Sequence, residues 1–420
     1  MKKIKNIILK EYETTEPWIL NSKDILEIEK INKLAKTEIF EIQANNRIRA
    51  KQYVWIVKVN NKNIQVLPKI FWDEQDSIMK NLLYMLSYTK KLNIKESDIA
   101  NLWKVNDLFE IFIYIYAKEL IELLKKDFKK NYNNIEENSS FLKWKLLFSR
   151  HIKNNLFNKS KFFIGYEKMD ENFLLNIFLN STCNKLLNIT KSKVNYKLLN
   201  KCSFILKDID IKVFKTPKSL NALNFNKQNK EYKNVFSLWK MLYFWNSPDF
   251  SKNLENNFSL LFDMNLLFEE FIVEFMKKNK ENIDLNINNV DSQISSKYVF
   301  KNNKFNLKPD IIVNYINDNI LIIDTKYKKL SNYKTNYWVS SQDIYQMFVY
   351  WMRYFWDYDK EKKKNIILLY PNYDWENYNT IHSSEENINI FIKTVNMNFD
   401  LSCNDWKERL IWEIKEVLDI

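Results

Sequence analysis

The C-terminal third of the chain has its most regular pattern of hydrophobic and polar positions. The first helix of this part carries apolar residues on most faces, which indicates that it is largely buried. Short apolar runs separated by polar turns follow, and a second helix precedes a last, fully apolar run. The pattern predicts a helix over 258–278, strands over 293–300, 307–315 and 320–327, a helix over 341–355 and a strand over 365–370.

The pattern of the preceding residues changes twice. Residues 53–59 form a β-rich run that a polar turn separates from 64–68, and this arrangement predicts a hairpin. From about 76 to 130, apolar residues recur at three- and four-residue spacing and predict helices. Residues 129–140 are polar and rich in Asn, so we expect a surface loop there, whereas 173–187 are expected to form a helix.

The length of the chain and these changes of period predict more than one folded region. A chain of 420 residues exceeds what one ordinary compact core holds. We therefore expect a mixed α/β protein with a mixed N-terminal region over 1–90 and a mostly helical middle region over 91–250. The α-β-β-β-α-β core follows over 251–420.

The composition indicates a folded, basic protein. Apolar residues make up 46% of the chain, and 65 basic against 52 acidic side chains leave a net charge of +13. This charge favours a polyanionic partner, with nucleic acid ahead of an anionic membrane surface. The alternative is a solvated surface rich in Lys and Asn.

Membrane, disulfide and zinc chemistry are not expected from the sequence. No run of 18 apolar residues is available to span a bilayer. The three cysteines are far apart, without a CxxC pair or a neighbouring histidine, so neither a disulfide framework nor a structural zinc site follows. We expect a cytoplasmic protein.

Two acidic residues and a lysine stand at the ends of two neighbouring predicted strands. Asp310 opens one strand, and Asp324 and Lys326 close the next, behind four consecutive aliphatic residues. In adjacent antiparallel strands the two carboxylates come side by side, and Lys326 projects to the face of Asp324. Carboxylate oxygens suit Mg²⁺, which phosphodiester hydrolysis uses to polarise phosphate and activate water. The D…DxK pattern is typical of PD-(D/E)xK nucleases.

Short motifs also arise by chance, and the alternative is that these aspartates cap strand ends. An acidic group at the end of a buried strand is costly without a cation or partner, which favours the metal site. Glu269 in the buried helix is a further candidate ligand, and Gln346 and Tyr350 lie one helical turn apart in the second helix.

Several segments resemble one known family, the McrC nuclease subunits of 5-methylcytosine-dependent McrBC restriction systems. The resemblance rests on LLFDMNLLFE at 260–269, LKPDIIV at 307–313, LIIDTKYK at 321–328, SQDIYQMFVY at 341–350, residues 53–70 ending in VLPKI, and the block 142–187. The segments span nearly the whole chain.

The resemblance implies a DNA endonuclease that cuts modified, methylcytosine-containing DNA with Mg²⁺. It implies catalytic roles for Asp310, Asp324 and Lys326, to which Glu269 and Gln346 are added as further candidates. Asp310, Asp324 and Thr325 are expected to hold the metal. The partner it implies is a McrB-like AAA+ GTPase, which recognises the modified base and whose GTP hydrolysis is stimulated through regions 1–90 and 91–250.

Two other functions remain open at this point. A nuclease of a DNA repair or recombination system, with a RecB-like site, would also carry Gln346 and Tyr350. A non-enzymatic assembly protein with an inactive site is the third possibility, against which the intact D…DxK pattern argues. A neighbouring gene for a McrB-type GTPase separates the first function from the second.

The chain is almost devoid of glycine. Average usage of about 7% would give roughly 29 glycines, yet the chain holds one, Gly165, together with 13 Trp. Trp55, Trp144, Trp338 and Trp356 stand where the resembled family tends to have glycine. Our hypothesis is that the source organism reads UGA as glycine and that this sequence was translated with UGA as tryptophan, so that these four positions are glycines. The alternative is genuine enrichment in tryptophan.

Overall fold

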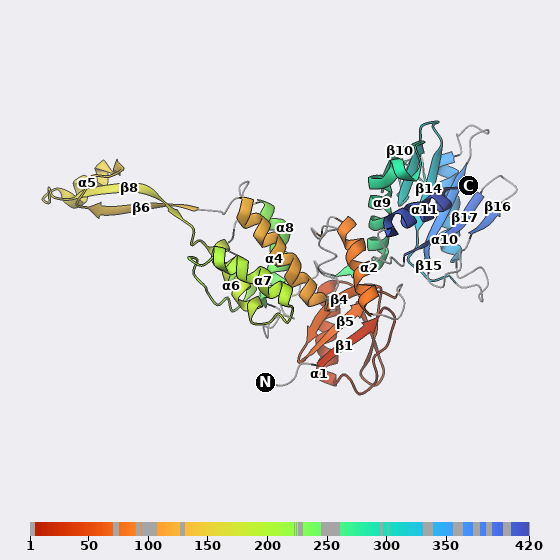
Figure 1. Cartoon of the computed structure of the whole chain (residues 1–420), viewed down its shortest axis with the longest axis horizontal. Helices are drawn as coiled ribbons and strands as arrows, with labels where there is room; N and C mark the ends of the chain where they lie inside the picture. Colours follow the sequence, from red (N-terminus) through yellow and green to blue (C-terminus); the bar gives the residue numbers. More distant parts are fainter. Residues whose placement is uncertain are drawn as a thin grey trace. The chain divides into compact units, whose positions relative to one another are not determined.

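The structure is a computed structural model with a mixed α/β fold (Figure 1). It describes residues 5–69, 75–89, 94, 107–126, 131–221, 223, 225, 230–244, 261–294, 297–300, 302–330, 339–355, 364–372, 379–383, 389–397 and 405–419. The chain forms two compact units, one of residues 1–108 with 258–420 and the other of 109–257. The first unit therefore joins the two ends of the chain, and the second is inserted between them.

The N-terminal sheet of the first unit has the strand order β1-β5-β4-β9. The predicted hairpin is confirmed, because β4 and β5 pair antiparallel through a turn in which Asn60 adopts a φ of 51°. Strand β9 pairs with β4, although some 200 residues separate them. The N-terminal sheet therefore includes a strand that follows the second unit in the sequence. The elements are β1 (Lys5–Lys10), α1 (Ser22–Ala35), β2 (Phe40–Gln43), β3 (Arg47–Ala50), β4 (Tyr53–Val59), β5 (Lys62–Leu67), α2 (Gln75–Tyr88) and β9 (Phe262–Asp263).

The C-terminal part of the first unit contains a six-stranded sheet of order β10-β13-β14-β15-β17-β16, a two-stranded sheet of β11 and β12, and helices. Strands β13 and β14 are antiparallel, whereas β14, β15 and β17 are parallel to one another. The elements are α9 (Met264–Ile283), β10 (Ile287–Ser292), β11 (Lys297–Tyr298), β12 (Asn306–Leu307), β13 (Ile311–Tyr315), β14 (Ile320–Thr325), α10 (Ser341–Phe355), β15 (Asn365–Asn372), β16 (Asn379–Ser383), β17 (Asn389–Asn396) and α11 (Trp406–Leu418).

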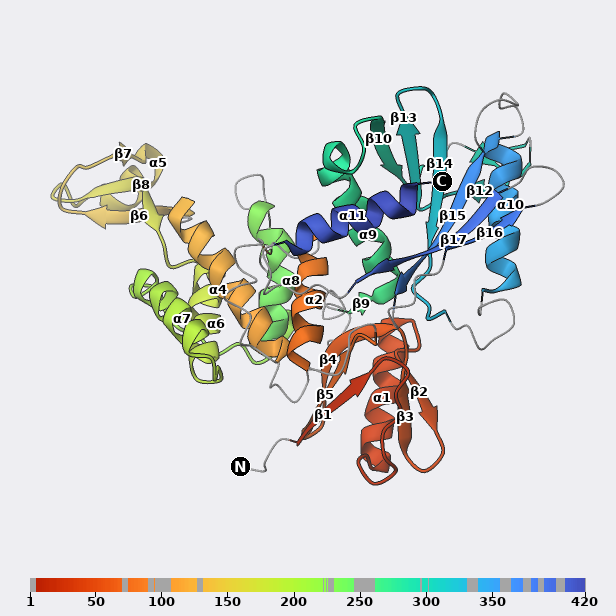
Figure 2. The ribbon, with the colours of Figure 1, turned by 45° about the vertical axis from the view of Figure 1, so that its right-hand side comes forward.

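Helices cover both faces of this sheet, which explains the continuous apolar runs of its central strands. Figure 2 shows α10 on one side and α9 with α11 on the other. Ile322 and Ile366 pack in the core beneath α10, and their neighbours Ile323 and Ile367, also buried, alternate to the opposite face. Asp324 therefore shares the α10 face with Ile322.

Most predicted elements of this core are present, and some of their bounds are corrected. The helix over 341–355 is confirmed, as is the strand from 365. The strand expected over 293–300 is confirmed only at Lys297–Tyr298, which form β11. Its start is wrong, because β10 ends at Ser292 and Gln293 takes a φ of 55° that no regular strand accommodates. The strand expected over 307–315 is divided into β12 and β13 around Pro309, which has no N–H to donate to a ladder.

The buried helix expected over 258–278 is α9, which begins and ends later than predicted. It starts at Met264 because the Asp263 side chain caps it by accepting a hydrogen bond from the Asn265 amide, 2.9 Å away. Residues 258–260 lie outside the described residues. Within the described residues, no helix combines the length and apolarity that crossing a bilayer requires.

The second unit consists of helices and a three-stranded sheet of order β6-β8-β7, which extends away from the helices (Figure 1). The loop expected over 129–140 is wrong, because 131–139 form β6, which pairs antiparallel with β8 along its whole length. Local composition indicated a loop, but pairing with the distant strand β8 determines the structure of these residues. The elements are α4 (Leu108–Lys126), β6 (Asn131–Ser139), β7 (Lys145–Leu146), α5 (Phe148–Asn155), β8 (Phe162–Asp170), α6 (Leu174–Leu187), α7 (Lys193–Ile205), η1 (Pro217–Leu220) and α8 (Lys230–Phe244).

Left-handed backbone positions are occupied by residues other than glycine in the described part of the chain. Asn takes four of them, at 45, 46, 60 and 303, in keeping with its tolerance of positive φ. Trp144 takes another, with a φ of 67° and a side chain that is 72% exposed. A bulky residue at such a φ is unusual, which supports the hypothesis of glycine at 144. Trp55 is buried in β4, and Trp338 and Trp356 lie outside the described residues.

We predict that Trp144→Gly stabilises the protein. The substitution removes a left-handed strain of about 1 kcal/mol or more and gives up only an exposed ring stacked on Tyr166. Urea unfolding measures the change. Trp412→Gly is the matched control, because Trp412 is also exposed but lies inside α11, where glycine costs about 1 kcal/mol. Equal destabilisation by both substitutions would contradict the strain argument.

Candidate active site

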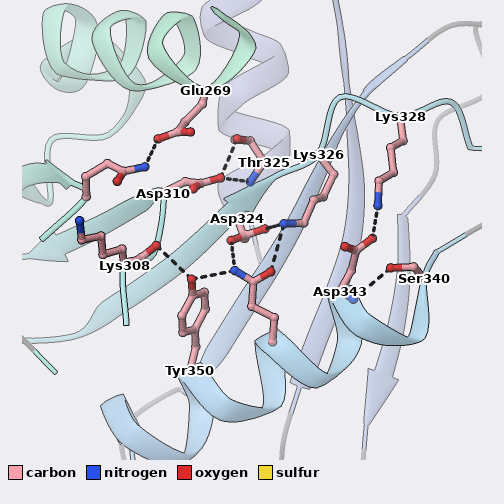
Figure 3. A network of polar contacts seen from close by, with 12 residues as sticks. Glu269, Lys308, Asp310, Asp324, Thr325, Lys326, Lys328, Ser340, Asp343 and Tyr350 are labelled. Atoms are coloured by element: carbon pink, nitrogen blue, oxygen red, sulfur yellow. Dashed lines mark hydrogen bonds and ion pairs between the residues drawn. The ribbon is translucent and has the colours of Figure 1, made fainter. Parts of the chain in front are cut away.

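Asp310 and Asp324 come together at one end of two neighbouring strands. The antiparallel register pairs Ile311 with Ile323, and one further step places Asp310 opposite Asp324. Oδ2 of Asp310 accepts hydrogen bonds from the amide and the hydroxyl of Thr325, each at 2.8 Å (Figure 3). The orientation of the Asp310 carboxylate is thus fixed by the strand that carries Asp324.

Lys326 and Asp324 form an ion pair inside the protein. Nζ of Lys326 lies 2.5 Å from Oδ2 of Asp324, whose side chain is only 1% exposed. The Lys326 amide donates to the carbonyl of Leu369 at 2.9 Å, so the lysine backbone continues the pairing of β14 with β15. Burying either charge alone would be strongly destabilising, so each requires the other or another ion.

A glutamine of α10 joins the two members of this ion pair. Oε1 of Gln346 accepts from Lys326 Nζ at 3.2 Å, and its Nε2 donates to Asp324 Oδ1 at 3.3 Å. The same Nε2 donates to the hydroxyl of Tyr350 at 2.8 Å, and that hydroxyl donates to the Lys308 carbonyl at 3.0 Å. The spacing of Gln346 and Tyr350, one helical turn, places both on the helix face that meets the sheet.

Glu269 approaches the site from α9 (Figure 3). Its Oε1 accepts a hydrogen bond from Gln293 Nε2 at 2.5 Å. Gln293 was not among the predicted site residues, because its position depends on a left-handed turn after β10 that carries no sequence signal.

Burial raises the pKa of each carboxyl group of the site, and the charge of Asp310 raises the pKa of the other two further. Burial raises the pKa of Asp324 to about 7, and the charge of Asp310 adds to this shift while Lys326 opposes it. Burial also raises the pKa of Asp310, and burial followed by the charge of Asp310 raises that of Glu269. Burial alone would lower the pKa of Lys326, but the Asp324 carboxylate outweighs it and raises that pKa. Three carboxyl groups thus face one ammonium, an imbalance that a divalent cation would relieve.

The donor set fits a magnesium ion better than a metal held entirely by protein. Among the described residues, no group of three His, Cys, Asp or Glu side chains is arranged to hold a metal ion by itself. Mg²⁺ typically keeps several waters and uses one or two carboxylates together with substrate phosphates. Asp310 and Asp324, which lie opposite each other on neighbouring strands, are two such carboxylates.

Comparison with known proteins identifies the family. The family model described as McrBC 5-methylcytosine restriction system component matches residues 48–371. The chain belongs to this family. The match extends from the N-terminal sheet to the end of β15 and includes Asp310, Asp324 and Lys326.

Individual relatives agree with this assignment. The Type IV methyl-directed restriction enzyme EcoKMcrBC of Escherichia coli (strain K12) is 26% identical over 314 residues, which are 70% of this chain and 86% of that protein.

Two solved structures are similar in fold. A chain of the half-complex from the tetradecameric assembly of Thermococcus gammatolerans McrB AAA+ hexamers with bound McrC has a TM-score of 0.70 at 20% identity. The match covers 98% of this chain and 100% of that one. A chain of the McrBC complex of the same organism has a TM-score of 0.50 at 24% identity, with 66% of this chain and 88% of that one covered.

The structure adds an ion pair that the sequence analysis missed. Nζ of Lys328 lies 2.9 Å from Oδ2 of Asp343, and the Asp343 amide donates to Ser340 Oγ at 3.1 Å. A serine three residues before an acidic residue at a helix start is a capping pattern, so this signal was present in the sequence. The pair ties the segment after β14 to the first turn of α10, beside the site.

We predict that Asp324→Asn makes the stability of the metal-free protein less sensitive to pH. The pKa of Asp324 rises from 3.8 to about 7 on folding, so its ionisation costs stability as pH increases through that range. The free energy of unfolding of the variant, relative to that of the wild type, should therefore rise between about pH 4 and pH 7 and stay constant above it, on top of the constant cost of leaving Lys326 without its partner. We expect a relative rise on the order of 1 kcal/mol between pH 4 and pH 8, measured by urea unfolding in EDTA.

Asp343→Asn provides a control of opposite sign. Although burial opposes it, the hydrogen bond from Lys328 lowers the pKa of Asp343, so this carboxylate stabilises the fold above its unfolded pKa. The control variant should therefore lose stability at pH 8. A fall in the stability of Asp324→Asn relative to the wild type between pH 4 and pH 8, as in the control, would show that the site does not hold surplus negative charge.

Proposed function

We propose that this chain is the DNA endonuclease subunit of a modified-cytosine-dependent restriction system. We further propose that its C-terminal core is a PD-(D/E)xK nuclease. The observation that supports the proposal best is the juxtaposition of Asp310, Asp324 and Lys326 at the end of two antiparallel strands. Membership of the McrBC family favours this system over a repair or recombination nuclease.

In the proposed mechanism Asp310 and Asp324 hold Mg²⁺. When bound, the ion supplies polarisation of the scissile phosphate and a lowered pKa for the attacking water. The Thr325 amide and hydroxyl both donate to Asp310, so Thr325 orients that ligand, and a direct ligand role would fall to its carbonyl oxygen. Glu269 lies close enough to raise the local negative charge and would act through water.

Lys326 is assigned to the charge that develops on the phosphate. Its ion pair with Asp324 keeps the side chain protonated, and an ammonium group stabilises anionic oxygens but cannot accept a proton from water. Gln346 contacts both Lys326 and Asp324 and therefore holds the two at a fixed separation. These contacts limit the side-chain motion that would misplace reacting groups.

A McrB-like AAA+ GTPase is the proposed protein partner. The structures similar to this chain come from complexes that contain McrB AAA+ hexamers or McrBC. The second unit carries large exposed apolar side chains around its three-stranded sheet, and such a patch indicates a protein-binding surface. Phe157 is 97% exposed, and the other members of this apolar tip are Phe141, Leu142, Trp144, Phe148, Ile152 and Leu156.

The nuclease assignment predicts that Asp310→Asn, Asp324→Asn and Lys326→Ala each abolish DNA cleavage. DNA binding and stimulation of GTP hydrolysis should persist, because distributed phosphate contacts and the second unit supply them. Plasmid cleavage and GTP turnover are measured in parallel for the reconstituted pair. Asp318→Asn, in the turn joining β13 to β14, should cleave normally. Cleavage by Lys326→Ala and Asp324→Asn at the wild-type rate would refute the assignment.

The partner assignment predicts that a charge on the apolar tip disrupts the complex. Ile152→Asp and Phe157→Asp should each reduce stimulation of GTP hydrolysis by at least about tenfold, because an unpaired charge would be buried at the interface. Phe204→Asp is the control, since Phe204 is 74% exposed in the same unit but lies on α7. Equal losses in all three variants would exclude the apolar tip as the contact. Point substitutions are preferred to truncation, because the first unit contains both chain ends.

A further inference from the structure

A buried carboxylate of the N-terminal sheet reaches the segment that carries Lys326. Glu11 follows β1 directly and is 4% exposed. Its Oε2 accepts two hydrogen bonds of 3.0 Å, one from the Lys69 amide and one from the hydroxyl of Tyr327. The latter joins residues 316 positions apart in the chain, next to the candidate catalytic lysine.

Tyr327 lies against one of the elements that build the site and against the N-terminal region. Its ring lies against Phe268 of α9, with centroids 6.0 Å apart, and Phe268 immediately precedes Glu269. The Lys69 ammonium lies 5.0 Å from the centroid of the same ring. The tyrosine itself is 3% exposed, so its position is set by these neighbours.

The N-terminal sheet also holds the beginning of α9. Strand β9 pairs with β4, and the Met264 amide donates to the Gln52 carbonyl at 3.1 Å. Both chain segments that deliver side chains to the site from this side are therefore attached to the N-terminal sheet. The attachment of α9 uses the backbone, whereas that of the Lys326 segment includes a side-chain hydrogen bond, from Tyr327 to Glu11.

A buried glutamate at position 11 lowers the stability of the fold, and filling space alone would not account for it. Burial raises the pKa of Glu11 to about 7, and Lys69 offsets only part of that effect. A well-packed apolar side chain of similar volume is often neutral or stabilising at such a site. An apolar side chain lacks the oxygen that accepts the hydrogen bond from the Tyr327 hydroxyl.

We propose that Glu11 is a positioning residue of the nuclease site, which fixes the 326–328 segment through the Tyr327 hydroxyl and so holds Lys326 against Asp324. This inference rests on the proposed nuclease function. Glu11 touches neither substrate nor metal in this proposal, and it acts only through Tyr327. Loss of the hydrogen bond frees the backbone next to Lys326, and a misplacement of about 1 Å can cost up to about 100-fold in rate.

Four variants of the full chain, assayed with its GTPase partner, test the proposal. Tyr327→Phe removes only the donor, and Glu11→Met removes the acceptor at nearly constant volume, together with the hydrogen bond from the Lys69 amide. Each should lower the single-turnover cleavage rate about tenfold or more, with DNA affinity and stimulation of GTP hydrolysis unchanged. The double variant should be no slower than the slower single variant, because both remove the same hydrogen bond. Glu11→Gln keeps an acceptor oxygen and should stay within about threefold of the wild type.

Asp24→Asn is the matched control. Asp24 is a second buried carboxylate of the N-terminal region, bonded to Lys62 and, at 2.8 Å, to Asn60. It should lower the melting temperature without lowering the cleavage rate at a temperature where the variant is folded. An equal loss of cleavage in Asp24→Asn would show that general loosening of the N-terminal sheet is responsible.

The outcomes separate this inference from the proposed nuclease function. If Lys326→Ala cleaves normally, the nuclease assignment fails. If Lys326→Ala is inactive and Tyr327→Phe cleaves at the wild-type rate, the assignment stands and the role of Glu11 is refuted. Independent, multiplying losses in Glu11→Met and Tyr327→Phe would also refute it. Circular dichroism of each variant verifies that each comparison is between folded proteins. Tyr327→Phe, which removes one oxygen atom, is the smallest of these changes.

Discussion

The burial of one carboxylate, that of Asp324, is the constraint on which the site depends. Four aliphatic residues of β14 carry it into a sheet that is covered on both faces, and its side chain is 1% exposed. Water cannot solvate it there, so the protein must supply an ammonium group and an amide, from Lys326 and Gln346. The register of β13, the position of α10 and the path of the chain after β14 all serve to place these groups.

The same arrangement leaves the site short of positive charge. Asp310 and Glu269 add negative charge near Asp324, and the single ammonium of Lys326 does not balance it. A fold selected only for stability would replace such a group by apolar residues. Local violations of stability rules are expected where a protein binds an ion or carries out chemistry. Electrostatic imbalance therefore supports the magnesium proposal more specifically than the presence of acidic residues does.

Sequence patterns were sufficient for elements whose environment is set locally. The hairpin of β4 and β5, the apolar strand β14 and the helix α10 followed from periodicity, because each buries a defined face. Strand β6 did not, since its Asn-rich residues are ordered by β8, some thirty positions later. For the site, the spacing of Asp310, Asp324 and Lys326 was readable from the sequence, whereas Gln293 depends on a left-handed turn that no residue type announced.

The contribution of the N-terminal sheet was also beyond the reach of sequence patterns, and it changes how the nuclease core is defined. A split into separate N-terminal and C-terminal parts would leave β4 without β9 and the Tyr327 hydroxyl without its buried acceptor. Each loss would leave polar groups without the hydrogen-bond partners that they have in the native fold. In the native chain, residues 109–257 are inserted between the two parts of one unit. Strand β4 of the N-terminal sheet can therefore pair with β9, which follows the insertion. The candidate site therefore depends on both the N-terminal and the C-terminal part of the first unit, although all of its proposed metal ligands lie in the C-terminal part.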